Sequence, residues 1–161
     1  MTPKPPQTQP LNQAAQNYLR TRVMTATPEQ LQMMLFDGAL RFAQAAKIAL
    51  TQKNHEQTYL NITRVQKILS ELICTLNHNV HPELCDRLTA LYQYAYKKLM
   101  DASMKHNMAS MDEALSVLNF QRETWSMLMQ QLGKQKAGMA AKNIPLSAPD
   151  SRMEASISMS A

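Results

Sequence analysis

The sequence is poor in glycine and cysteine and contains no long hydrophobic run. Only 3 of its 161 residues are Gly, which leaves few positions for the left-handed turns of β-hairpins and phosphate-binding loops. An all-β fold and a glycine-rich nucleotide site are therefore poor candidates. Two Cys residues and a Pro- and Gln-rich start, MTPKPPQTQP, predict a reduced cytoplasmic protein. No segment approaches the roughly 20 apolar residues that cross a bilayer, so we expect no stable membrane association.

The net charge of +5 is confined to the two ends of the chain. Residues 1–27 carry three basic residues and no acid, residues 28–132 carry ten of each, and residues 133–161 carry four basic and two acidic residues. A nucleic-acid-binding domain concentrates basic charge on its folded face, so the neutral centre predicts no nucleic acid partner. The alternative is a regulatory bundle that binds nucleic acid through its basic ends, with Arg20, Arg22, Lys134, Lys136 and Lys142.

Helix boundary signals divide the central part into four segments. Proline is tolerated at the first helical position but not in a helix interior, and Thr27-Pro28 with Gln30 forms a capping-box pattern. Further starts are predicted at Asn54, His81 and Ser110, and Gly133 is a stop signal. Between these marks the apolar residues recur at helical spacing. The sequence predicts an all-α, antiparallel up-down four-helix bundle over 27–133, a short helix within 11–26, a disordered head over 1–10 and a flexible basic tail over 134–161.

The ionisable residues form no catalytic pattern. We find no nucleophile–base pair and no pair of acids at a spacing that would bring them together inside a bundle, so we expect neither an enzyme nor a cofactor. The one metal-like pattern joins the second and third segments: Cys74, His78, His81 and Cys85. Spacings of four place side chains on one helix face, and Cys2His2 sets bind zinc. A buried Cys beside core leucines and exposed turn histidines explain the same residues more simply.

Several segments carry more apolar residues than one bundle stripe needs. A second stripe rotated from the first is either the flank of a wide core or a groove for partner helices. Thirteen methionines favour the groove, because a flexible thioether adapts to different shapes. The candidate groove residues on these stripes are Met33, Phe36, Leu40, Tyr92, Tyr96, Val117 and Phe120.

A longer string of residues resembles a known family. Tyr18 and Val23, then Thr25-Ala26-Thr27-Pro28, then Leu35-Phe36-Asp37-Gly38 are similar to the N-terminal signature of the FliS flagellar secretion chaperones. Further matches follow in the order and spacing of that family, and the resemblance extends over residues 18–129: Ile68-Leu69-x-Glu71-Leu72, Leu91-Tyr92-x-Tyr94, Leu99, Ala102 and Trp125.

The resemblance implies a fold and a function. The family has an antiparallel bundle with a short N-terminal helix packed across it. The resemblance implies that this protein binds the C-terminal helical segment of flagellin in the cytoplasm. It also implies that the protein prevents premature polymerisation of flagellin and delivers it to the flagellar type III export apparatus. An export gate component or co-chaperone is a further implied partner, and a homodimer is a further expectation. Tyr18 matches the family's N-terminal Tyr, whose segment covers the bundle when no client is bound, so Tyr18 joins the candidate groove.

Overall fold

The computed structural model describes residues 10–142, so residues 1–9 of the expected disordered head over 1–10 and residues 143–161 of the expected tail lie outside it. Pro10, the last residue of that expected head, is instead the first residue of a helix. The described residues form helices and no strand. The five helices are α1 (Pro10–Thr25), α2 (Pro28–Thr51), α3 (His55–Cys74), α4 (Pro82–Lys105) and α5 (Met108–Lys142). An all-α fold is therefore confirmed.

Two of the helix starts use the caps that the sequence predicts. The Thr27 hydroxyl accepts from the backbone N–H of Gln30 at 3.3 Å, and the Gln30 side chain accepts from the Thr27 N–H at 3.0 Å. At α3, the Asn54 carboxamide accepts from the backbone N–H of Gln57 at 3.1 Å. Each cap satisfies amide groups that the first helical turn leaves without an intrahelical partner. α4 begins at Pro82 after His81, but the His81 side chain makes no capping hydrogen bond.

The predicted start and end of the last helix are both wrong. Asn107, not Ser110, caps α5: its side chain accepts from the backbone N–H groups of Ala109 and Ser110 at 2.9 and 3.3 Å. Ser110 itself is buried inside the first turn. At the other end, α5 continues through Gly133 to Lys142, because one glycine in a helix interior costs only about 1 kcal/mol. The first part of the expected tail, residues 134–142, is therefore helical, and its side chains are exposed.

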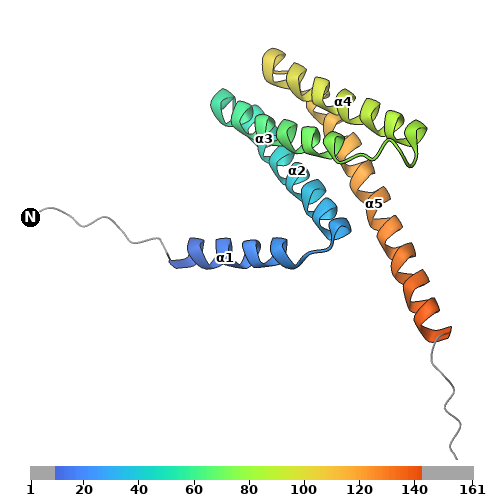
Figure 1. Ribbon diagram of the computed structural model, residues 1–161. Coiled ribbons are helices and arrows are strands. Elements are labelled where there is room, and N and C mark those ends of the chain that lie inside the picture. Colours follow the sequence, from blue (N-terminus) through green and yellow to red (C-terminus); the bar gives the residue numbers. More distant parts are fainter. Residues whose placement is uncertain (1–9, 143–161) are drawn as a thin grey trace, which may run out of the picture. The chain divides into compact units, whose positions relative to one another are not determined.

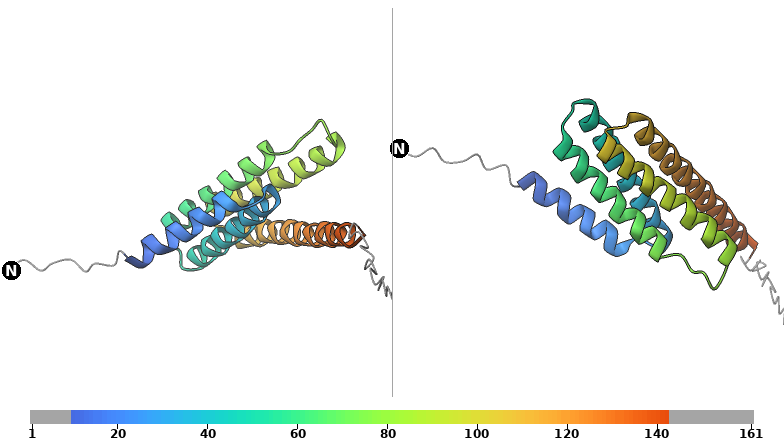
Figure 2. Two further views of the ribbon diagram at one scale, coloured as in Figure 1. Left: turned by 60° about the horizontal axis from the view of Figure 1, so that its bottom comes forward. Right: turned by 90° about the horizontal axis from the view of Figure 1, so that it is seen from above.

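Helices α2 to α5 form an antiparallel bundle. In Figures 1 and 2, α2, α3 and α4 run side by side. The end of α2 meets the start of α5 through Lys47 Nζ and Asp112 Oδ1, 2.7 Å apart. The start of α3 meets the residue that follows α4, since the rings of His55 and His106 stack with centroids 4.0 Å apart. Contacts between opposite helix ends of this kind define the up-down arrangement.

The core is filled from all four bundle helices. α2 contributes small side chains, among them the fully buried Ala39, Ala43 and Ala46, which let a neighbouring helix approach closely. The largest side chains in the centre are Phe36, Tyr92, Ile62, Leu69, Leu72, Leu99, Met111 and Leu118. Burial of this apolar surface holds the bundle together.

α1 differs from the bundle helices because its side chains stay exposed. Tyr18 is 69% exposed and Met24 76% exposed, and Leu19 and Val23 are also at the surface. The expected packing of this helix across the bundle is therefore not found.

Candidate partner-binding surfaces

Three of the eight candidate groove residues belong to the core. Phe36 is 1% exposed, Tyr92 2% and Leu40 8%, so no partner reaches their side chains in this structure, and we correct the sequence prediction for them. The physical reason is that α2 packs against α3 on one side and α5 on the other. Neighbouring helices therefore cover a wide part of the α2 surface, which includes both of its apolar stripes. The Phe36 ring lies 6.5 Å from the rings of Tyr92 and Trp125, centroid to centroid.

The other five candidates remain at or near the surface. Tyr18 on α1 and Phe120 on α5 are strongly exposed, and Tyr96 on α4 is 37% exposed. Met33 on α2 and Val117 on α5 are half-buried. The structure distributes these five residues over four helices, so they do not form one stripe.

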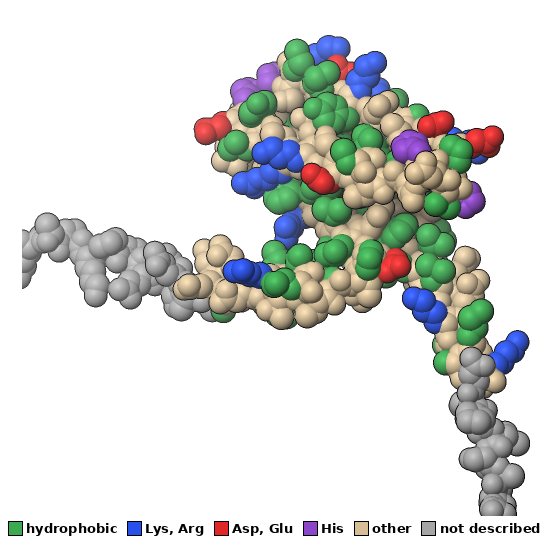
Figure 3. Space-filling model, in the orientation of Figure 1, with side chains coloured by type: hydrophobic (Ala, Val, Ile, Leu, Met, Phe, Trp, Pro, Cys, Tyr) green, Lys and Arg blue, Asp and Glu red, His purple; other side chains and the backbone are tan. Residues whose placement is uncertain are grey.

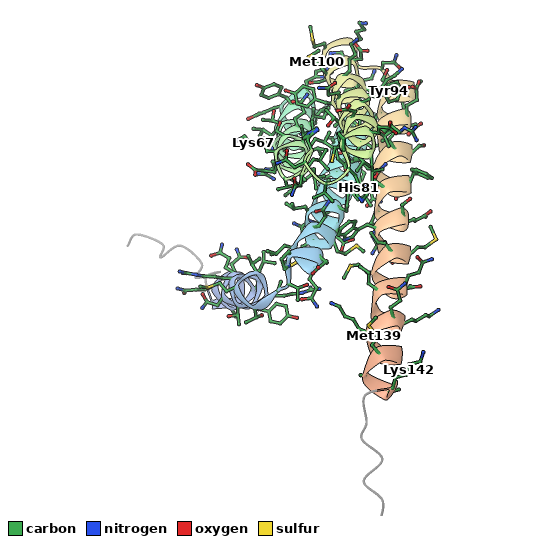
Figure 4. The ribbon with its side chains drawn as sticks, turned by 45° about the vertical axis from the view of Figure 1, so that its right-hand side comes forward. Lys67, His81, Tyr94, Met100, Met139 and Lys142 are labelled. Carbon is green, nitrogen blue, oxygen red and sulfur yellow. The ribbon has the colours of Figure 1, made fainter. Side chains whose placement is uncertain are left out.

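The outer surface of α4 carries a shallow groove with a largely apolar lining. We call it the α4 face, and it has a volume of about 360 Å³. Figure 4 labels two of its residues, Tyr94 and Met100, on α4, and Figure 3 shows hydrophobic side chains at the bundle surface between charged ones. Met104, one turn beyond Met100, is 74% exposed. The lining residues are Ala90, Gln93, Tyr94, Tyr96, Lys97 and Met100.

A polar cluster fixes the edge of the α4 face against α5. The Tyr94 hydroxyl donates to the Glu113 carboxylate, and Lys98 Nζ lies 2.7 Å from the same carboxylate. The hydrogen bond from Lys98, followed by that from Tyr94, lowers the pKa of Glu113. The same interactions with Glu113 raise the pKa of Tyr94 and of Lys98. The cluster therefore holds the Tyr94 ring in one orientation beside the groove.

A second groove lies where α1 turns into α2. Its volume is about 270 Å³, and three methionines contribute to its lining: Met33, Met34 and Met129. Asp37 lies in the same groove and accepts from Arg122 Nε at 2.7 Å. This hydrogen bond raises the pKa of Arg122. Flexible thioether side chains beside a charged pair suit a surface that adapts to a polypeptide.

Trp125 lies at the α2–α5 contact. Its indole N–H donates to the backbone carbonyl of Glu29 at 3.0 Å. The half-buried ring therefore fills space beside Phe36 while its one polar atom is satisfied. The resemblance to the family includes Trp125 but gives it no role. The structure shows that Trp125 helps to pack α5 against α2.

The structure does not gather the four residues of the metal alternative, Cys74, His78, His81 and Cys85, into one site. Cys74 is exposed, Cys85 is buried and both are free. His78 Nδ1 lies 3.6 Å from Asp86 Oδ1. Within residues 10–142 no group of three or more His, Cys, Asp or Glu side chains is placed to hold a metal ion. The α3–α4 connection instead carries an open pocket of about 420 Å³ that includes His81 and Arg87.

Sequence reasoning omitted Tyr94 and Met100 from the candidate groove. Both are more than 40% exposed, Tyr94 at 44% and Met100 at 42%. For Met100 the available signal was the spacing of Tyr96, Met100 and Met104 at four-residue steps, which places the three on one side of a helix. No such spacing identifies Tyr94.

No helix within the described part of the chain is long and apolar enough to span a membrane.

The bundle and its apolar grooves define the chain as an all-α protein with surfaces suited to other polypeptides. A family model described as "Flagellar protein FliS" matches residues 11–132. The flagellar secretion chaperone FliS of Bacillus subtilis is 32% identical over 121 residues, which cover 75% of this chain and 90% of that protein. The chaperone of the same name from Campylobacter jejuni is 30% identical over 114 residues, which cover 71% and 89%.

A solved structure supports the fold. The crystal structure of a bacterial flagellar chaperone superposes with a TM-score of 0.60 and 18% identity, and the match covers 76% of this chain and 99% of that one. The chain belongs to the FliS family of flagellar secretion chaperones, as the sequence resemblance implied. It is accordingly a chaperone and not an enzyme.

Proposed function

We propose that this chain binds the C-terminal helical segment of flagellin in the cytoplasm, prevents its premature polymerisation and delivers it to the flagellar type III export apparatus. Membership in a family of flagellar secretion chaperones supports a flagellar client. The main structural support for a helical client segment is the α4 face. There Tyr96, Met100 and Met104 follow one another at four-residue steps on an exposed helix surface.

Helix-in-groove recognition explains this surface. An amphipathic client helix presents apolar side chains at i, i+3, i+4 and i+7, and it needs a complementary apolar stripe to bury them. Met100 and Met104 supply adaptable contacts, while Tyr96 supplies a rigid aromatic anchor with few rotamers to lose. The Tyr94 hydroxyl is already held by Glu113, so the ring is oriented before the client arrives and less entropy is lost on binding.

The other exposed candidates extend the proposal beyond α4. We assign Phe120 and Val117 on α5 and Met33 on α2 to secondary client contacts, which an extended segment reaches as it passes over several helices. Tyr18 and the other apolar side chains of α1 compete with the client for part of this surface. An export gate component or co-chaperone receives the loaded complex, and two empty chaperones pair through their exposed apolar faces.

A titration tests the proposal. The full chain is titrated with a synthetic peptide of the C-terminal helical segment of flagellin from the same organism, and heat and peptide helicity are recorded together. We expect saturable 1:1 binding with a gain of helix. Absence of saturable binding to the unmodified chain contradicts the proposed function.

Variants then locate the groove. We expect the double variant Tyr96→Ala/Met100→Ala to weaken binding by about tenfold or more. Ile48→Ala/Leu84→Ala is the matched control, because Ile48 and Leu84 are 59% and 54% exposed and lie outside the α4 face. An equal loss in both double variants means that binding follows general hydrophobicity and that the α4 face is not the site.

A further inference from the structure

Two arginines from different helices share one aromatic ring on the surface between α2 and α3. The guanidinium carbon of Arg41 on α2 lies 5.2 Å from the centroid of the Phe42 ring, and that of Arg64 on α3 lies at the same distance. A guanidinium at this distance from an aromatic ring is held by cation–π attraction. Both arginines are exposed, while Phe42 is half-buried. The ring therefore fixes two cations beside each other without neutralising either.

None of these cations is paired with a carboxylate among the described residues, whereas four other bases of the bundle are. Arg41 and Arg64 form no ion pair within residues 10–142, and neither does the exposed Lys67, three residues after Arg64. Figure 4 labels Lys67 on α3. We call the set Arg41, Phe42, Arg64 and Lys67 the basic seam. The bases that are paired are Lys47, Lys98, Lys105 and Arg122.

Apolar surface continues from the basic seam along both helices. One helical turn before Phe42, Gly38 lies beside Ile68, whose Cδ1 is 3.6 Å from where a Cβ on Gly38 would stand. Arg41 also lines a small pocket of about 230 Å³ together with Met34, Asp37 and Gly38 of α2 and with Leu19 and Arg22 of α1. The seam thus alternates cations with apolar side chains, and it does not form a purely basic patch.

We propose that the basic seam docks an acidic amphipathic helix of a partner protein. Its carboxylates bind Arg41 and Arg64, and its apolar residues lie on Phe42 and over Gly38 and Ile68. With each guanidinium carbon 5.2 Å from one centroid, the two are at most 10.4 Å apart. Carboxylates one helical turn apart, about 5 Å along a helix, fall within this limit. An arginine stacked on a ring keeps its N–H groups free for a bidentate carboxylate contact.

The neighbouring charges favour a peptide over a nucleic acid. The exposed Glu71 follows Arg64 by seven residues, two turns along the same side of α3. A continuous phosphate backbone that follows α3 would pass close to this carboxylate, whereas an amphipathic helix can place an apolar or basic residue opposite it. Nucleic acid affinity also depends on many phosphate contacts, and the seam offers three cations.

This surface is separate from the one in the proposed function. The basic seam consists of α2 and α3 residues, and the α4 face consists of α4 residues. The two proposals therefore fail independently, because each has variants that leave the residues of the other unchanged.

The test uses the full chain and a fluorescent peptide helix as the probe. The probe carries Glu at successive i, i+4 positions and Leu on the adjacent face, and fluorescence anisotropy measures its binding. We expect saturable binding that Arg41→Glu/Arg64→Glu weakens by about tenfold or more. The control Arg87→Glu/Lys134→Glu makes the same change in net charge elsewhere and should leave binding unchanged. Arg41→Gln/Arg64→Gln gives the same comparison without charge reversal should the first variant fail to fold.

Four results would overturn the proposal. The first is no saturable binding of the probe, and the second is an equal loss in the seam variant and its control. The third is equal binding of a probe in which Gln replaces every Glu, since the seam would then recognise only apolar surface. The fourth is tighter seam-dependent binding of single-stranded RNA or of anionic phospholipid vesicles than of the acidic helix, which would assign the seam to another class of partner.

Discussion

Replacing Gly38 by alanine should stabilise the bundle. Gly38 lies in the interior of α2 within the family signature Phe36-Asp37-Gly38. A glycine at such a position suggests close approach of a neighbouring backbone. The structure shows otherwise: the nearest atom to an added Cβ is the side-chain atom Ile68 Cδ1 at 3.6 Å, an ordinary van der Waals distance. The φ angle of Gly38 is not positive, so alanine is not strained there.

The size of the effect follows from helix propensity. Alanine is more favourable than glycine in a helix interior by about 0.8–1.0 kcal/mol, chiefly because the unfolded chain loses conformational freedom. The new methyl group gains contact with Ile68 without displacing it. We therefore expect Gly38→Ala to raise the free energy of unfolding by about 1 kcal/mol. For a chain of 161 residues this corresponds to an increase in Tm of about 2–4 °C.

Urea unfolding followed by circular dichroism measures this change. The matched control is Ala45→Gly, because Ala45 lies seven residues further on, on the same edge of α2, and is also half-buried. The Ala45→Gly control should lower the free energy of unfolding by about 1 kcal/mol. A loss of stability in Gly38→Ala would refute the reasoning, since it would mean that α2 and α3 approach more closely than the 3.6 Å contact allows.

Two further predictions concern the core and the α4–α5 contact. Phe36→Ala should lower the free energy of unfolding by about 3–5 kcal/mol, because the ring is 1% exposed and packs on Tyr92 and Trp125. Urea unfolding measures this change. Unchanged stability together with lost client binding would mean that Phe36 belongs to the groove after all. Glu113 has a lowered pKa in the fold, from hydrogen bonds led by Lys98. Its ionised form therefore stabilises the protein above the ordinary value of 4.5, and that contribution disappears as the pH falls through the lowered pKa. In Tm measurements across pH, wild type should exceed Glu113→Gln at neutral pH and lose this advantage in acid, whereas a pH-independent gap would contradict the assignment.

The bundle was predictable because the starts of its helices depend on local cap residues. A cap such as Thr27 or Asn54 acts over three or four residues, so its hydrogen bonds can be inferred from sequence alone. The last helix shows the limit of this reasoning. Asn107 and Ser110 are both good caps, and only the burial of Ser110 decides between them. Gly133 is a stop signal whose cost of about 1 kcal/mol the surrounding helix formers outweigh.

The candidate surface was less predictable than the fold, because exposure depends on how many neighbours a helix has. A stripe containing Phe36 and Leu40 has the same spacing whether one helix or two pack against α2. Its burial follows from the position of α5, which the spacing does not encode. The basic seam was also absent from the sequence reasoning: Arg41 and Arg64 are 23 positions apart, and only the pairing of α2 with α3 brings both to Phe42.

α1 supplies an independent physical reason for competition with a client. It has 16 residues, near the length at which an isolated helix is marginal in water. It also exposes Tyr18, Leu19, Val23 and Met24. Burying a large apolar side chain contributes about 1.5–3 kcal/mol, so covering even two of these four would favour a docked α1. A client helix that occupies the same surface has to replace that contribution before it gains net affinity. On this reasoning, Tyr18→Ala should bind the flagellin peptide more tightly than the unmodified chain in the same titration, and weaker binding would contradict the competition.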